Sequence, residues 1–75
     1  MLKMTSESDI LGLKIVIINE MHRRWKIPYD KLSDLIDEYE VLPYIEVSYD
    51  YFNSMGMTAI LREIKAFIIQ QGGAL

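Results

Sequence analysis

The stretch DILGLKIVIINEMHRRW, residues 9–25, decides the fold, because the four β-branched residues at 15–18 would also suit a strand. On a helical wheel, however, its apolar side chains share one broad face. They are Ile10, Leu11, Leu13, Ile15, Ile17, Ile18, Met21 and Trp25. Helical periodicity holds for about four turns without a turn signal, so the stretch predicts a helix. Lys14 falls inside the apolar face, and we expect its ammonium to reach water or an acidic side chain.

Three further amphipathic segments follow, and proline or glycine separates them. Pro28 and Pro43 suit the first turn of a helix, where the missing backbone N–H costs nothing. The expected helices are residues 29–40, 43–54 and 59–71. The four segments together predict an all-α fold, a compact bundle of four short helices.

The expected helix ends rest on individual residues. Ser6 has capping-box spacing for the first helix, and Thr58 is the expected N-cap of the fourth. Gly56 is expected to end the third helix with a positive φ, which glycine adopts without strain. Residues 1–8 and 72–75 are expected to be loose ends of a single helical domain, 1–75.

Length and composition exclude several classes of protein. The 75 residues make one domain, and the absence of cysteine removes disulfides and thiolate metal sites. His22 is the only histidine, so no cofactor or metal is expected, and we expect it to be a packing residue. The longest unbroken apolar run, residues 15–18, is far shorter than the roughly 20 residues that span a bilayer. We therefore expect a cytoplasmic protein without a membrane segment.

The charges are unevenly distributed along the chain. The net charge is −3, with a basic segment at residues 22–26 and six acids but no base between residues 34 and 50. The basic segment, which includes Trp25, leaves open a small nucleic-acid-binding regulator. The net charge argues against it, and so does the favourable place of basic residues at a helix C-terminus. An acidic surface can also steer a basic partner.

Catalytic residue patterns are missing from the sequence. Asp34, Asp37 and Glu38 have the spacing of a solvated helix face, and no nucleophile–base pair or phosphate loop is present. The protein is therefore expected not to be an enzyme.

Five tyrosines are unusual for this length, and their spacing divides them into two groups. Tyr39, Tyr44 and Tyr51 fall at core positions, whereas Tyr29 and Tyr49 are the better surface candidates.

Part of the chain resembles a known family. The residues that carry the resemblance are Leu32, Leu35, Tyr39, Val41, Leu42, Tyr44, Ile45, Tyr49, Asn53–Gly56, Glu63 and Ile64. The family is a group of short bacterial proteins known only as a domain of unknown function, and the resemblance covers roughly residues 10–70. Its members are often encoded near toxin-type, ADP-ribosyltransferase-like proteins. The resemblance therefore implies an antitoxin-like or accessory role, and it implies no active-site residue.

These observations favour a non-enzymatic protein-interaction module. The first and third helices carry more apolar surface than a chain of this length can cover, so we expect a protein partner. A homodimer is the default, because two-fold dimers are the commonest oligomers, and a toxin-type protein is the other candidate. The expected interface residues are Leu11, Ile18, Trp25, Tyr49 and Ile69. A self-assembling structural protein is a further alternative.

Overall fold

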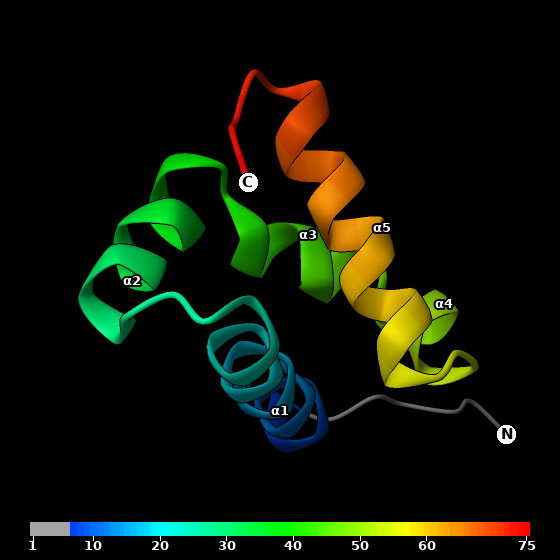
Figure 1. The fold of residues 1–75 in the computed structure, drawn as a ribbon. Helices are drawn as coiled ribbons and strands as arrows, with labels where there is room; N and C mark the ends of the chain where they lie inside the picture. The colour runs from blue at the N-terminus through cyan, green and yellow to red at the C-terminus, as the bar shows by residue number, and fades with distance from the viewer. Residues whose placement is uncertain (1–6) are drawn as a thin grey trace, which may run out of the picture.

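The computed structural model describes residues 7–75, and all of its regular elements are helices (Figure 1). They are α1 (Glu7–Trp25), α2 (Tyr29–Glu38), α3 (Val41–Val47), α4 (Tyr49–Asn53) and α5 (Met57–Gln70). No strand occurs within residues 7–75, which confirms the all-α prediction. The expected third helix is divided into α3 and the single-turn α4. Residues 1–6, including the proposed cap Ser6, lie outside the described residues.

Helix α1 settles the question of helix or strand in the first segment. The β-branched residues 15–18 are helical, and Ile17 and Met21 on the same side are fully buried. Of the two outcomes expected for Lys14, the structure shows the acidic partner, because its Nζ lies 3.0 Å from Oε2 of Glu46 on α3. Helix α1 begins at Glu7, inside the range expected to be a loose end.

Helix α3 lies at the centre of the arrangement. It contacts α1, α2 and α4, while α5 packs against α1 (Figure 1). The buried core consists of Ile17, Met21, Leu32, Ile36, Val41, Ile45, Phe52, Ile60, Leu61, Ile64 and Ile68. Every one of these side chains is apolar, so helix packing is the main source of stability.

The third helix was predicted to begin at Pro43, and this start is wrong by two residues. Helix α3 begins at Val41, and Pro43 occupies a later place in its first turn, where a backbone N–H is still not needed. The backbone then changes direction at Ser48, which separates α3 from α4. The N–H of Ser48 bonds to the carbonyl of Tyr44, and the carbonyl of Ser48 accepts from Phe52, so hydrogen bonding continues across the break.

The predicted positive φ at Gly56 is wrong. Gly56 has φ −75° and ψ 160°, and its carbonyl accepts the N–H of Ile60, so it is the N-cap of α5. The reason is that the turn after α4 has already closed through the N–H of Met55, which bonds to the carbonyl of Phe52. Thr58, the expected cap, lies inside α5 instead.

Within residues 7–75, left-handed backbone occurs at three other positions. Lys26 follows α1 with φ 57°, Glu40 precedes α3 with φ 52°, and Gly72 follows α5 with φ 93°. The N–H groups of Gly72 and Gly73 bond to the carbonyls of Ile69 and Ile68, which is the Schellman arrangement at a helix end. Of these three positions, only residue 72 holds glycine, the residue type that tolerates a left-handed backbone best.

Replacing Lys26 with glycine is expected to raise the free energy of unfolding by roughly 0.5–1 kcal/mol. Relief of the left-handed conformation contributes about 1–2 kcal/mol, and the greater flexibility of unfolded glycine offsets part of it. Lys65 lies exposed inside α5, so Lys65→Gly is the matched control and should lower stability by up to about 1 kcal/mol. Urea denaturation measures both. Equal losses in the two variants would contradict the assignment of strain to Lys26.

Candidate protein-binding face

An apolar stripe on α1 remains partly uncovered. Leu11 is 57% exposed and Ile15 is 50% exposed, and the half-buried Ile18 continues the line toward the core. The spacing of four and three residues places the three side chains on one side of the helix. Val16 is equally exposed at 49%, but it lies about 100° away from Ile15 around α1.

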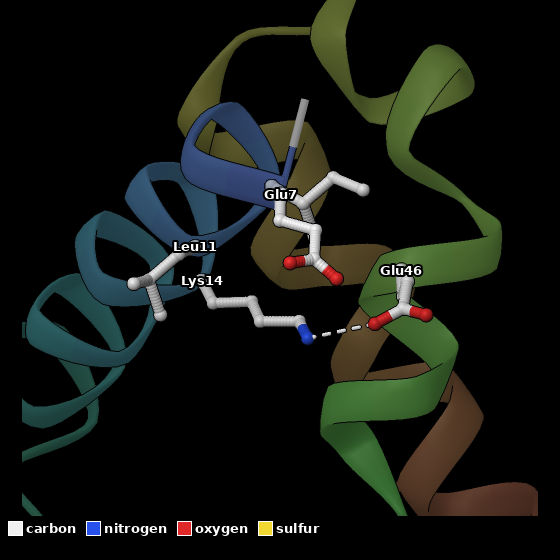
Figure 2. A pocket seen from close by; sticks show the side chains of 5 residues that line it. Glu7, Leu11, Lys14 and Glu46 are labelled. Carbon is white, nitrogen blue, oxygen red and sulfur yellow. Dashed lines mark hydrogen bonds and ion pairs between the residues drawn. The ribbon is translucent and has the colours of Figure 1, made fainter. Parts of the chain in front are cut away.

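The stripe borders the line along which α1 meets α3. Figure 2 shows Lys14 reaching from α1 to the carboxylate of Glu46, with Leu11 pointing outward from the same helix. These residues, with Glu7 and Ile10, line a hollow of about 280 Å³. The ion pair is partly exposed, so it contributes little to stability and mainly orients the two side chains.

A second hollow lies one helical turn farther along the same two helices. Ile18 is one turn from Lys14 on α1, and Leu42 is one turn from Glu46 on α3. Helix α2 provides the remaining wall, and the hollow has a volume of about 170 Å³. Its lining comprises Ile18, Tyr29, Leu32, Ser33, Ile36, Asp37 and Leu42.

The two hollows and the stripe form one surface, which we call the α1–α3 face. Its apolar members are Leu11, Ile15, Ile18 and Leu42, and its charged members are Glu7, Lys14, Asp37 and Glu46. Three carboxylates therefore accompany one ammonium, and that ammonium is already paired with Glu46. The face is apolar along its middle and acidic overall.

The corner between α1 and α2 supports this face. The rings of His22 and Tyr29 stack with centroids 3.8 Å apart. Nδ1 of His22 lies 2.7 Å from the carbonyl oxygen of Ile27, and it must donate because a carbonyl only accepts. The Tyr29 hydroxyl donates to Oδ1 of Asn19 at 3.1 Å. His22 is thus a packing residue, as expected.

The basic segment at the end of α1 is largely engaged within the molecule. Arg23 and Arg24 both bond to Oε1 of Glu20, at 2.6 and 2.8 Å, and Arg24 also donates to the hydroxyl of Thr58. The hydrogen bond from Arg23, followed by that from Arg24, lowers the pKa of the Glu20 carboxyl below its usual value of 4.5. The carboxylate therefore offsets part of the positive charge of this segment.

The five expected interface residues do not come together. Leu11 and Ile18 lie on the α1–α3 face, whereas Trp25 packs partly buried against the core. Tyr49 is half-buried on α4, and Ile69 is 48% exposed on α5. Ile15, Glu46 and Asp37 also belong to the α1–α3 face and are not among the five expected interface residues. For Ile15, the available signal in the sequence was its i, i+4 spacing from Leu11.

The structure modifies the expected division of the tyrosines. Tyr39 and Tyr44 are half-buried, and burial raises the pKa of both phenols. Tyr51 is 57% exposed, so the prediction that it belongs to the core is wrong, and Tyr49 is the more covered of the two. The cause is the break at Ser48, which shifts the helical register between α3 and α4. Tyr29 is 54% exposed, as expected.

Two kinds of feature are absent from the described residues: a metal-binding cluster and a membrane-spanning helix. Within residues 7–75, no three side chains of His, Cys, Asp or Glu gather where they could hold a metal ion. None of the helices in this range combines the length and hydrophobicity needed to cross a bilayer.

The fold and the face together define a small all-α domain with an uncovered, acid-flanked apolar surface. The chain belongs to the family described as "Protein of unknown function (DUF3791)", whose model matches residues 13–71. No curated protein and no solved structure matches the chain with significance. The matched range includes most of the α1–α3 face but leaves out Glu7 and Leu11.

Proposed function

We propose that this protein is a non-enzymatic interaction domain that binds a partner protein through the α1–α3 face. The observation that carries the proposal is the exposure of Leu11 and Ile15 on one side of α1, next to two hollows. Burying the exposed part of two such side chains contributes roughly 1–3 kcal/mol. A continuous apolar surface with a polar rim is typical of a protein-binding site.

The role that we propose is antitoxin-like or accessory to a toxin-type protein of a bacterium. Two observations support it: the resemblance to short proteins encoded beside such toxins, and an acidic face that can cover a basic surface. In this role the domain acts by occupying the partner's surface, and it needs no catalytic residue.

The nucleic-acid alternative receives less support from the geometry. Arg23 and Arg24 share the carboxylate of Glu20, so the basic segment offers a phosphate less net positive charge than its sequence suggests. Self-association would use the same apolar surface as a partner protein, and the experiment below separates the two.

Site-specific photo-cross-linking in the organism that encodes the protein tests the proposal. A photoreactive phenylalanine at Ile15 is expected to give a discrete covalent adduct, whereas the same residue at Val16 gives none. The two positions are matched, because they are neighbours on α1 with exposed fractions of 50% and 49%. An adduct larger by 8.8 kDa identifies a second copy, and any other mass identifies a partner protein. Absence of adducts at Ile15, or equal adducts at both positions, would refute binding through this face.

A further inference from the structure

We infer that the α1–α3 face accepts an amphipathic helix of another protein, with an apolar stripe flanked by lysine or arginine. The inference rests on the proposed function and adds the chemistry of the partner. Two properties of the face lead to it: its elongated apolar middle and the sign of the surrounding charge.

The shape of the apolar middle suits a helix. Leu11, Ile15 and Ile18 span two turns of α1, which corresponds to about 10 Å at a rise of 1.5 Å per residue. Leu42 and Glu46 run along the facing side on α3, so the hollows lie one after the other along one line. A docked helix presents anchors at positions i, i+3 or i+4, and i+7, which match a line of this length.

The charge around the apolar middle selects a basic helix. Glu7 and Glu46 lie at one hollow and Asp37 at the other, so carboxylates are present at both ends. Lys14, the one base lining the two hollows, already bonds to Glu46. Lysine or arginine on the flanks of a docked helix would find carboxylates there, whereas glutamate would be repelled.

The same charges disfavour a second copy of this chain on the face. In a closed two-fold dimer, the same surface of both copies forms the interface, so the acids Glu7, Asp37 and Glu46 of one copy would lie against a surface that carries the same excess of acids. Like charges held together in an interface oppose association. The occupant is therefore a different protein.

Two synthetic 18-residue peptides test the partner's chemistry on the 75-residue chain. Both carry the same leucine stripe at positions i, i+4 and i+7, and one has lysine flanks where the other has glutamate. Titration followed by ¹H–¹⁵N NMR is expected to show the lysine peptide binding at least tenfold more tightly at low salt. The shifts should concentrate at Leu11, Ile15, Ile18 and Leu42, and added salt should reduce the difference between the peptides.

Matched variants locate the binding site. Ile15→Ser is expected to weaken the lysine peptide at least fivefold, while Val16→Ser leaves its affinity unchanged. Asp37→Lys is expected to weaken it severalfold, while the same substitution at Asp50, an exposed acid on α4, has a smaller effect. Thermal denaturation of each variant confirms that the fold is retained.

The outcomes separate this inference from the proposed function. Equal affinity for the two peptides, or no shift on the face at millimolar peptide, overturns the basic-helix occupant. A dimer in sedimentation equilibrium that Ile15→Ser dissociates also overturns it, because the occupant is then a second copy. In each of these cases a position-specific adduct at Ile15 would still support protein binding by the face.

Discussion

Replacing Phe52 with alanine is expected to lower the free energy of unfolding by about 3–5 kcal/mol. Phe52 is fully buried, although it comes from the shortest helix of the described chain. Its ring meets Tyr44 edge-on with centroids 5.6 Å apart. Truncation would remove this contact and leave a cavity in a small core, and the loss approaches the whole stability of a domain of this size.

Tyr51→Ala is the control for this substitution. Tyr51 precedes Phe52 on α4 but is 57% exposed, so its truncation is expected to cost less than about 1 kcal/mol. Urea denaturation followed by circular dichroism measures both variants. If Phe52→Ala prevents folding, Phe52→Leu provides a milder test with the same sign. A loss below about 1 kcal/mol in Phe52→Ala would show that α4 does not anchor the core.

Replacing Tyr44 with alanine is expected to cost about 2–3 kcal/mol, the second largest effect. The Tyr44 ring stacks on Phe67 with centroids 3.9 Å apart and an interplanar angle of 4°. This contact joins the central α3 to α5, which is distant in sequence. Tyr44→Phe keeps both ring contacts and should lose less than about 1 kcal/mol.

The phenol of Tyr44 provides an independent test in alkaline solution. Burial raises its pKa above the usual 10.0, and the nearby Glu63 carboxylate and the Tyr51 phenol act in the same direction. The folded state therefore holds the proton more tightly than the unfolded state, and the stability falls as the pH rises above about 10. Ultraviolet titration of the folded protein should show two late-ionising tyrosines, Tyr39 and Tyr44, and Tyr44→Phe should remove one of them. If Tyr44→Phe instead removed a tyrosine that ionises near the ordinary pKa of 10.0, the half-buried placement of this phenol would be contradicted.

The fold class and the helices followed from periodicity, and the exceptions have local causes. Periodicity identified α1 correctly in spite of its β-branched run, and it placed Lys14 in the apolar face, where an acidic partner was one of two expected outcomes. It did not reveal the break at Ser48, because hydrogen bonding continues across that residue. The left-handed backbone at Lys26 and Glu40 was also missed, since neither residue type favours that conformation.

The candidate face could be predicted only in part. A helical wheel shows that the apolar arc of α1 is broad, but it cannot show which side of the arc α3 and α5 cover. The structure leaves Leu11 and Ile15 on the uncovered side and buries Ile17 and Met21 on the other. The acids at Asp37 and Glu46 join this side through tertiary packing of α2 and α3, which no local pattern encodes.

The purely apolar core separates the thermal behaviour of the domain from its response to ionic strength. All eleven buried side chains identified within residues 7–75 are hydrophobic. Their burial is driven by entropy near 25 °C and carries a large heat-capacity change, so stability has a broad maximum at about 10–20 °C. Added sodium chloride screens the carboxylates of the α1–α3 face but has few charges to act on within the core. Warming therefore acts first on folding, whereas ionic strength would act first on the proposed association with a partner.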